Sequence, residues 1–374
     1  MNFKWNPENL FLRLIILLLA IGTVVMYSAS SFEGAMKHDD YMYYLLKHIV
    51  WLIVGCSAYF AASRLKYKRL KYVIPYLVGI TWILIILAFI INPTDKPSRW
   101  LILFGRSWMT TSDIARIMLI IYTAYFLDIH QKGLSDWKYM LKNFSFVPGL
   151  TLIMILFQPD LGSTLMISLI IFSMLYIGEV SYRYILIIIA SGLICVTIKV
   201  STTSYMMARL FNWSPTTEIS NDNQQLKSLW ALGKGGWFGN GPGSSRMKDG
   251  HLPAAHTDFI LPIIGEEYGF MGISALFILF IAMFHFGIQI LKAASDRFGM
   301  FIVIGILLNI IFYFLINTSY AIGILPNTGL AMPFISYGGS NTIFTLLSIG
   351  LLMSIAREAS LRSESYYRGV SNGS

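Results

Sequence analysis

Three acidic side chains lie where a long polar stretch meets an apolar one. Asp258 follows His256 and Thr257 at the end of the polar stretch, and Glu266 and Glu267 come shortly after it. An acid at the mouth of a membrane helix is costly unless it is hydrated, paired or used in a reaction. Asp258 is therefore a candidate functional residue. Thr257 or Asp258 could instead cap the amides of the helix that follows, and spacing alone leaves both interpretations open.

Further charged residues lie in stretches that are rich in Gly or Pro. Asp113 and Arg116 are three residues apart and could pair on one helix face, either as a structural ion pair or as part of a site. Residues 325–340 contain two prolines and three glycines. Irregular backbone at membrane depth must be buried in protein or line a wet cavity. These stretches predict an outward-facing polar cavity, with the candidate substrate-binding residues Arg99, Arg106, Asp113, Arg116, Asp160, Arg209, Arg246, Lys248, His256, Thr257, Ser336, Tyr337 and Ser340.

The sequence contains no motif typical of a transition-metal or nucleotide site. Cys56 and Cys195 each lie inside an apolar run without the Cys or His spacing of a metal site, so small buried residues are the better account. The absence of a P-loop motif argues against a nucleotide-driven motor. We therefore assign no residue to a metal site.

The composition is that of a helical membrane protein. Of the 374 residues, 56% are hydrophobic and 13% are charged, whereas a soluble domain carries about 25% charged residues. The mean hydropathy is +0.63, and many apolar runs approach the roughly 20 residues that cross a bilayer. The sequence predicts an all-α, polytopic protein that forms a single integral membrane domain over residues 1–374. Its ten expected spans are approximately residues 10–29, 46–62, 72–91, 112–128, 144–157, 161–178, 183–199, 260–291, 300–320 and 338–356.

Two long segments lie outside these spans. A loop of about 60 residues, approximately 200–258, connects spans seven and eight. This is longer than a plain connector needs, which favours a functional loop over a flexible linker. Residues from about 360 to 374 are expected to form a disordered cytoplasmic tail.

The basic residues predict the orientation. If the N-terminus is cytoplasmic, 16 of the 28 Lys and Arg residues lie on the cytoplasmic side, and six of the other 12 lie in or beside the long loop. Long loops count little in the positive-inside rule, so the short loops divide 16 to 6 and favour both termini in the cytoplasm. Membrane topology also explains the net charge of +9 without a nucleic-acid partner.

Five motifs, spread over nearly the whole chain, resemble those of the SEDS family (shape, elongation, division and sporulation). They are YSAS at 27–30, SRW at 98–100, QPDLG at 158–162, LPxAHTDFI at 252–260 followed by GEE, and TGLxxPFISYGGS at 328–340. The resemblance implies a ten-span peptidoglycan glycosyltransferase that polymerises lipid II into glycan strands outside the bacterial cytoplasmic (inner) membrane. It also implies a class B penicillin-binding protein as partner and Asp258, the acid of the HTDF motif, as the catalytic residue.

Within the family, GPGSSRMK at 241–248 and PFISYGGSN at 333–341 favour the division branch (FtsW-like) over the elongation branch (RodA-like). A division role implies action at the septum with other division-complex proteins. The chain departs from the family pattern at Ala254, where Glu is usual, and at Lys227, which is often Gln. It also has TTSD with Arg116 at 110–116, where the family has QPSE-x-x-K. We therefore assign no specific role to Ala254 or Thr110.

A glycan polymerase of this kind joins a sugar 4-hydroxyl to an anomeric carbon that carries a lipid pyrophosphate. The hydroxyl is a weak acid and needs a positioned base, whereas the pyrophosphate needs charge neutralisation more than protonation. One carboxylate and several cations can therefore serve, unlike the carboxylate pair of a glycosidase. Asp258 fits this requirement together with five cations and, optionally, a divalent Mg or Mn ion at the pyrophosphate. The five cations are Arg99, Arg106, Arg209, Arg246 and Lys248.

Two other functions are compatible with these residues. A flippase or other transporter of lipid-linked precursors would also use charged groups near breaks in helices, but it would place them near the membrane midplane. A structural scaffold of a division complex would leave Asp258 and its motif without a reason.

Overall fold

The computed structural model describes residues 7–91, 99–103, 106–203, 207 and 224–371, and their side chains except at 103–108 and 362–371. Apolar runs within these ranges form helices because a membrane segment must satisfy its backbone polar groups internally. The helices are α1 (Pro7–His38), α2 (Tyr43–Arg64), α3 (Leu70–Ile91), α4 (Thr111–Ile129), α5 (Trp137–Asn143), α6 (Phe146–Phe157), α7 (Leu161–Ile177), α8 (Tyr182–Thr202), α10 (Gln224–Gly235), α11 (Ile260–Ala293), α12 (Arg297–Ala321) and α13 (Gly339–Ser371).

The predicted all-α, polytopic architecture is confirmed, and each expected span coincides with a helix. Among the described residues, seven helices are long and apolar enough to cross a membrane, or eight if the bent pair α5 and α6 forms one span. The helix α7 is apolar but shorter. The helix α4 carries Asp113, Arg116 and Asp128, so its composition is less apolar although most of its side chains are buried.

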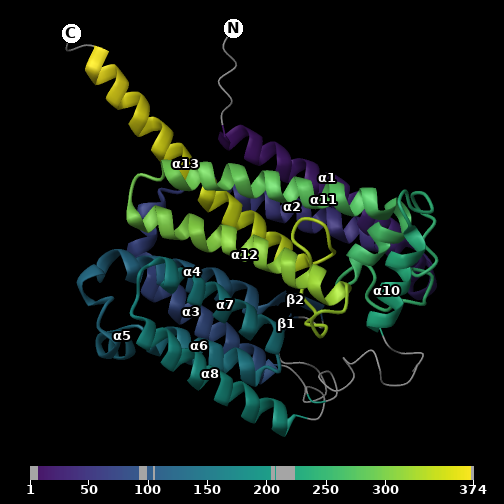
Figure 1. The fold of residues 1–374 in the computed structure, drawn as a ribbon, viewed down its shortest axis with the longest axis horizontal. Coiled ribbons are helices and arrows are strands. Elements are labelled where there is room, and N and C mark those ends of the chain that lie inside the picture. Colours follow the sequence, from purple (N-terminus) through teal and green to yellow (C-terminus); the bar gives the residue numbers. More distant parts are fainter. Residues whose placement is uncertain (1–6, 92–98, 104–105, 204–206, 208–223, 372–374) are drawn as a thin grey trace.

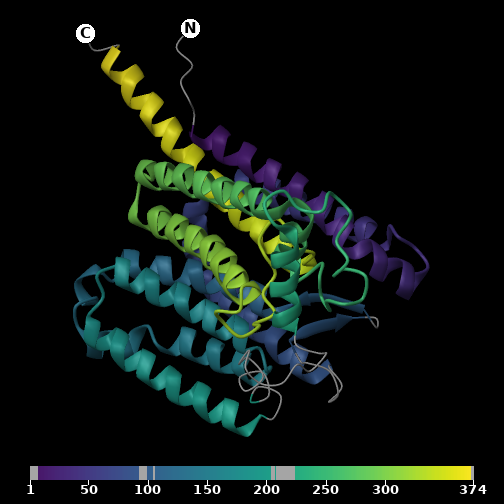
Figure 2. The ribbon, with the colours of Figure 1, turned by 45° about the vertical axis from the view of Figure 1, so that its right-hand side comes forward.

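The helices form two groups that run side by side (Figure 1). In one group α13 packs along α2 and α1 packs along α11, whereas the other contains α3, α4, α6, α7 and α8. The helix α12 joins the groups because it contacts α11 and α13 on one side and α4 and α7 on the other. The same arrangement is visible from a second direction in Figure 2.

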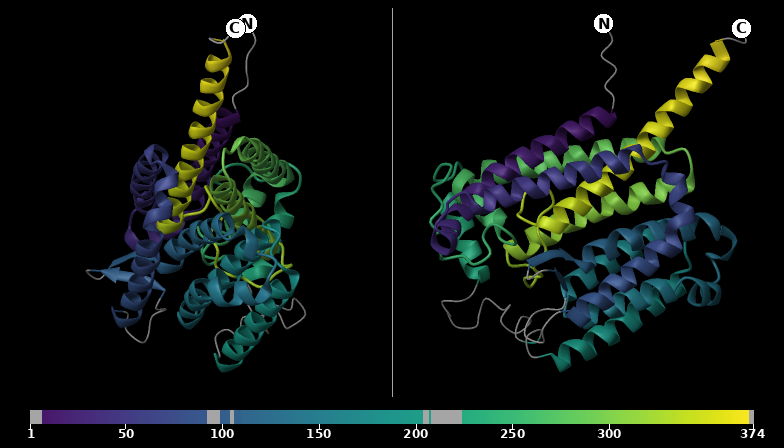
Figure 3. Two further views of the ribbon diagram at one scale, coloured as in Figure 1. Left: turned by 90° about the vertical axis from the view of Figure 1, so that its left-hand side faces the viewer. Right: turned by 180° about the vertical axis from the view of Figure 1, so that it is seen from behind.

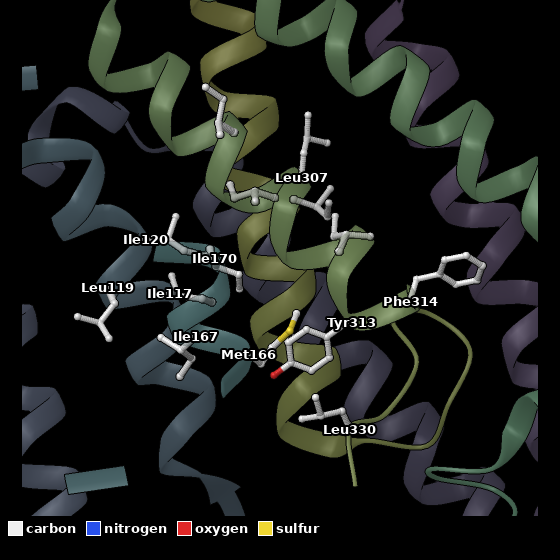
Figure 4. Close-up of a cluster of buried hydrophobic side chains, with 14 of the residues drawn as sticks. Ile117, Leu119, Ile120, Met166, Ile167, Ile170, Leu307, Tyr313, Phe314 and Leu330 are labelled. Carbon is white, nitrogen blue, oxygen red and sulfur yellow. The ribbon is translucent and has the colours of Figure 1, made fainter. Parts of the chain in front are cut away.

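The apolar core lies where α12 meets α4 and α7 (Figure 4). Lipid tails are as apolar as leucine, so close packing holds such helices together rather than escape from water. Gly305 permits this packing, because a β-carbon there would lie 2.4 Å from Ile120 Cγ2. The buried side chains labelled in Figure 4 are Ile117, Leu119, Ile120, Met166, Ile167, Ile170, Leu307, Tyr313, Phe314 and Leu330.

The eighth predicted span is interrupted near its start. Within α11, Gly269 has φ 65° and ψ −163°, a conformation open almost only to glycine. Two backbone amides that follow the break bind carbonyls of the preceding loop. Phe270 N donates to Gly236 O at 2.9 Å and Met271 N to Trp237 O at 3.1 Å. Irregular backbone here is therefore buried in protein, as membrane depth requires.

A β-hairpin precedes α4, and the sequence analysis did not predict it. Strands β1 (Trp100–Leu103) and β2 (Arg106–Thr110) pair antiparallel, with Trp100 opposite Thr110. Short strands of this kind give weak sequence signals, and the Gly- and Pro-containing segment was read only as a loop. The hairpin holds Arg99 and Trp100 of the SRW motif against the beginning of α4, since Thr111 N donates to Arg99 O at 3.1 Å.

Two other segments are more ordered than expected. The predicted loop of about 200–258 contains α10, which packs against α11. The predicted disordered tail from about residue 360 instead continues α13 to Ser371. It contains no proline between Leu361 and Ser371 to end a helix that is already formed.

The two ends of the bundle differ in character. The beginning of α1 and the end of α13 project from one end, whereas α10 and the hairpin lie at the other (Figures 1 and 3). The predicted orientation, with both termini in the cytoplasm and the long loop outside, stays a prediction.

Candidate active site

A polar cavity of about 360 Å³ opens at the end of the bundle that carries the hairpin. Its walls come from segments far apart in the sequence: α2, the hairpin, the beginnings of α4 and α7, the turn before α11, α12 and the segment leading into α13. The cavity is lined by Trp51, Arg99, Trp100, Thr110, Ser112, Asp113, Asp160, Ser163, Thr257, Asp258, Tyr313, Gly329, Leu330, Ala331, Tyr337, Gly338, Gly339, Ser340 and Asn341.

The structure brings together only some of the residues predicted for the site. Those that line the cavity are Arg99, Asp113, Asp160, Thr257, Asp258, Tyr337 and Ser340. Arg116, Arg246, Lys248, His256 and Ser336 do not line it and have other surroundings. Arg209 and the side chain of Arg106 lie outside the part of the chain that the structure describes.

Asp258 lies in a tight turn whose geometry begins at Ala254. Ala254 has φ 56°, and its carbonyl accepts from the amides of Thr257, Asp258 and Phe259 at 3.1–3.2 Å. The Asp258 carbonyl in turn accepts from Asn317 Nδ2 and Tyr320 Oη of α12, at 3.1 and 2.9 Å. The main chain at Asp258 is therefore fixed from both sides while its side chain lines the cavity.

The capping position of α11 lies one residue beyond the two residues predicted for it. The helix α11 begins at Ile260, and the capping position belongs to Phe259, which makes no side-chain capping hydrogen bond. Thr257 uses its hydroxyl to donate to Ala254 O at 3.2 Å instead. The turn thus orders the HTD segment without relying on a capping side chain.

The predicted pair of Asp113 and Arg116 forms, with Arg116 Nη1 3.2 Å from Asp113 Oδ1. Arg116 is 1% exposed, donates from Nη2 to Asn341 Oδ1 at 3.0 Å and lies over the ring of Tyr313. It is therefore buried beside the cavity rather than exposed in it, and its predicted contact with substrate stays a prediction. Its role here is to neutralise Asp113 and to tie α4 to α13.

Thr110, which departs from the family pattern, forms a polar cluster with Ser340, Asp113 and Arg116. Its hydroxyl and that of Ser340 both contact Asp113 Oδ2, and they lie 2.6 Å from each other. Thr110 N also donates to Ser340 Oγ at 3.2 Å. The cluster connects β2, α4 and the beginning of α13 at the rim of the cavity.

Asp160 has a structural partner set within the cavity wall. Its carboxylate caps α7 by accepting from Ser163 N at 3.2 Å, and it accepts from Ser112 Oγ at 2.9 Å. Arg99 Nη1 lies 3.9 Å from Asp160 Oδ1, and the Arg99 side chain is 32% exposed. Among the side chains that the structure describes, Arg99 is the one cation that lines the cavity.

Two predicted cations serve a different part of the molecule. Lys248 Nζ lies 3.2 Å from Glu267 Oε1, and it donates to Ser28 Oγ at 2.9 Å and to Gly243 O at 2.6 Å. Arg246 is exposed; its amide donates to Glu266 Oε1 at 3.2 Å and its carbonyl accepts from Asp249 N at 3.2 Å. The reason is electrostatic: the buried carboxylates of Glu266 and Glu267 require partners, and the glycine-rich loop supplies them.

His256 and Ser336 lie beside the residues that line the cavity. The Ser336 hydroxyl accepts from Met332 N at 3.0 Å, within the segment that leads to Tyr337. The His256 ring is buried between those of Tyr44 and Tyr337, and its carbonyl accepts from Tyr337 N at 2.9 Å. Neither side chain lines the cavity.

Sequence reasoning missed several lining residues. Trp100 and Asn341 belong to motifs that were recognised, SRW and YGGSN, but no role was assigned to them. Trp51 lies in an apolar run, and Tyr313 lies in the middle of α12, so neither had a signal that separates it from a core residue. Aromatic rings beside polar groups give the cavity surfaces suited to the faces of sugar rings.

Comparison with known proteins decides the family. Residues 8–361 match the family described as "Cell cycle protein", whose name combines FtsW, RodA and SpoVE. The chain belongs to this SEDS family. It is 34% identical over 368 residues to a "Probable peptidoglycan glycosyltransferase FtsW" of Geobacter metallireducens, covering 95% of this chain and 98% of that one. It is 30% identical to "Stage V sporulation protein E" of Bacillus subtilis, again covering 95% and 98%.

Solved structures share the SEDS fold. The RodA protein of Thermus thermophilus superposes with a TM-score of 0.68 at 23% identity, covering 96% of this chain and 99% of that one. A chain from a structure named for a "peptidoglycan synthase complex" gives a TM-score of 0.73 at 22% identity, covering 93% and 97%. The sequence relatives named FtsW confirm the prediction that this SEDS protein is FtsW-like.

Proposed function

We propose that this SEDS protein is a peptidoglycan glycosyltransferase that polymerises lipid II into glycan strands at the outer face of the cytoplasmic membrane. The observation that carries the proposal is Asp258: its main chain is fixed by α12 and its side chain lines a polar cavity at one end of a membrane bundle. A polymerase needs such a site because its lipid carrier stays in the bilayer while the sugars react at the surface. The FtsW relatives named as probable peptidoglycan glycosyltransferases support the same reaction.

The reaction forms one bond and breaks one. The 4-hydroxyl oxygen of an acceptor sugar attacks the anomeric carbon of the donor, and Asp258 takes the hydroxyl proton as general base. The bond from that carbon to the lipid pyrophosphate breaks, and the pyrophosphate leaves with its electron pair. Arg99, a partly exposed cation in the cavity, stabilises the developing negative charge. Trp51 and Trp100 offer apolar faces that can position the sugar rings.

A divalent cation can be accommodated only with help from the substrate. The described residues contain no group of three His, Cys, Asp or Glu side chains that could hold a metal ion. Asp113 and Asp160 are already used by Arg116 and by the α7 terminus. Mg²⁺ often binds through one or two carboxylates plus substrate phosphates, so Asp258 is the residue that could share it with the pyrophosphate. Such an ion would supply charge neutralisation.

The proposed orientation places α10, the hairpin and the cavity outside, with both termini in the cytoplasm. The 16 to 6 division of basic residues in short loops supports it. A division role at the septum is supported by the FtsW-named relatives, and an elongation role of the RodA type is the alternative within the same chemistry. We further propose a class B penicillin-binding protein as partner, together with other division-complex proteins.

A transporter of lipid-linked precursors is the second candidate function. It would require polar residues near the membrane midplane with a gate on each side. In this chain the polar lining residues gather at one end of the bundle, among the hairpin, the HTD turn and the 325–340 segment. This distribution favours chemistry at one face over passage through the bilayer.

Purified protein with labelled lipid II tests the proposal. We expect glycan polymer, with a low rate for the isolated chain that rises when its cognate class B penicillin-binding protein is added. The same preparation in vesicles measures movement of lipid II between leaflets. Movement without polymer, in the presence of the partner, would contradict the proposed function and favour the transporter.

A further inference from the structure

The end of α1 reaches the segment that carries Asp258. The helix continues to His38, past the predicted end of its span at residue 29, and lies beside the loop elements at that end of the bundle (Figure 3). Glu33, on this extension, has its Oε2 3.2 Å from His256 Nδ1. Glu33 therefore contacts a residue two positions before Asp258.

The His256 ring is enclosed apart from this contact. Its side chain is 8% exposed, whereas that of Glu33 is 28% exposed. The ring centroid lies 4.7 Å from that of Tyr44 and 5.6 Å from that of Tyr337. His256 Nδ1 lies within ion-pair distance of the Glu33 carboxylate, and no hydrogen-bond partner of Nδ1 is found among the described residues. A buried ring nitrogen without an acceptor is costly, which makes this contact important for the orientation of the ring.

Movement of His256 would be transmitted to the cavity by two routes. Thr257 and Asp258 follow it directly in a turn closed by three amides on one carbonyl, that of Ala254. The His256 carbonyl also accepts from Tyr337 N at 2.9 Å, and Tyr337 lines the cavity. A general base must lie within hydrogen-bond reach of the proton it takes, so a small displacement of this turn changes the rate.

We propose that Glu33 is a positioning residue for Asp258 that acts through His256. The inference rests on the proposed polymerase function. Glu33 itself does not line the cavity, so it affects the reaction without touching substrate. Its second oxygen lies 2.6 Å from Lys37 Nζ, one turn further along α1, which holds the carboxylate toward the end of the helix.

The substitution Glu33→Gln keeps the size of the side chain and removes its charge. Displacement of a reacting group by about 1 Å can cost about a hundredfold in rate. We expect kcat for polymerisation to fall by about tenfold or more, with KM for lipid II changing by less than about threefold, because the cavity lining is untouched. Asp249→Asn is the matched control: it removes an exposed carboxylate from the loop before the HTD turn and should leave both constants unchanged.

A double-mutant cycle tests whether Glu33 acts through His256. We expect Glu33→Gln combined with His256→Gln to be no slower than the slower single variant, because residues that act as a unit are not additive. Additive losses, or a Glu33→Gln variant with wild-type kcat, would overturn the inference. If the wild type polymerises lipid II and Asp258→Asn does not, either of these outcomes would contradict only the positioning role of Glu33. The proposed function would still stand. If the wild type makes no polymer with its partner, the proposed function fails first, and the inference fails with it.

Discussion

Asp258 and the pair Glu266 and Glu267 lie eight and nine residues apart in the sequence and are used in opposite ways. At Asp258 the main chain carries the structural contacts, to α12, and the carboxylate lines the cavity. Glu266 and Glu267 are buried, and both their carboxylates and their main-chain carbonyls contact the glycine-rich loop. The two cases differ in the surroundings of the carboxylate: that of Asp258 lines the cavity, whereas those of Glu266 and Glu267 are buried among donors from the loop and α1. Under the proposed function, the first acid takes part in the reaction and the other two bind the loop.

The carboxylates of Glu266 and Glu267 accept hydrogen bonds from the glycine-rich loop and from α1. Glu266 accepts from Ser245 Oγ and from the amides of Arg246 and Met247, and Glu267 accepts from Ser28 Oγ at 2.6 Å. These contacts join α1, the glycine-rich loop and α11. A buried carboxylate with several donors is satisfied only when the loop is in place, so the loop is ordered by α11 rather than by its own sequence.

Breaking the ion pair between Lys248 and Glu267 should have the largest effect on stability. Lys248→Met leaves the carboxylate of Glu267 buried without its cation, and loss of one partner of a buried pair costs about 3–5 kcal/mol. We expect a correspondingly large drop in thermal stability, measured by the unfolding of purified protein in detergent. Lys234→Met, which removes an exposed cation from α10, should change little.

The double variant Lys248→Met, Glu267→Gln sharpens this result. Removing the carboxylate charge together with its cation leaves no uncompensated charge, so most of the lost stability should return. A single Lys248→Met variant as stable as the wild type would show that Lys248 is not a structural partner of Glu267.

The break in α11 should have the next largest effect. Gly269→Ala places a β-carbon 2.4 Å from Gly239 N in a conformation that only glycine adopts readily. We expect a loss of about 1–3 kcal/mol in stability, seen as earlier thermal unfolding and faster proteolysis of the loop. Gly192→Ala, in α8 with open space around it, is the control and should be neutral or slightly stabilising. Equal melting of the two variants would contradict a strained, loop-dependent break.

Much of the fold could be predicted because apolar runs alone identify membrane helices, and short-range pairs follow from helical spacing. Asp113 and Arg116 are an example, since three residues separate them on α4. Lys248 illustrates the limit: as an unpaired cation in a polar loop it was assigned to the pyrophosphate. Its partner Glu267 lies beyond the HTD turn and the first residues of α11, and only the folded chain brings Ser28 to both.

The sequence predicts only part of the site, because some lining residues lie in recognisable motifs and others do not. Thr257, Asp258, Asp160 and Ser340 lie in recognisable motifs, and they line the cavity. Trp51 and Tyr313 lie within helices, where an aromatic residue facing a cavity has the same sequence signature as one facing the core. Glu33 was missed because the apolar pattern ended the first span before it, whereas the helix continues.

The smallest effect on stability and the largest on activity are expected at Asp258. Asp258→Asn keeps the side-chain size and the carbonyl contacts with Asn317 and Tyr320. We expect a change of about 1 kcal/mol or less in stability. An amide cannot accept the proton of the sugar hydroxyl as a carboxylate does, so polymerisation should fall by roughly a hundredfold or more.

The direct measurement is the rate of glycan polymer formation from labelled lipid II by the Asp258→Asn protein in complex with its class B penicillin-binding protein. Melting temperature and complex formation are measured on the same sample. We predict a folded, partner-bound variant that forms almost no polymer, while Asp249→Asn polymerises at the wild-type rate. A folded, partner-bound Asp258→Asn variant with near wild-type rates would contradict the account and leave Asp258 with a structural role alone.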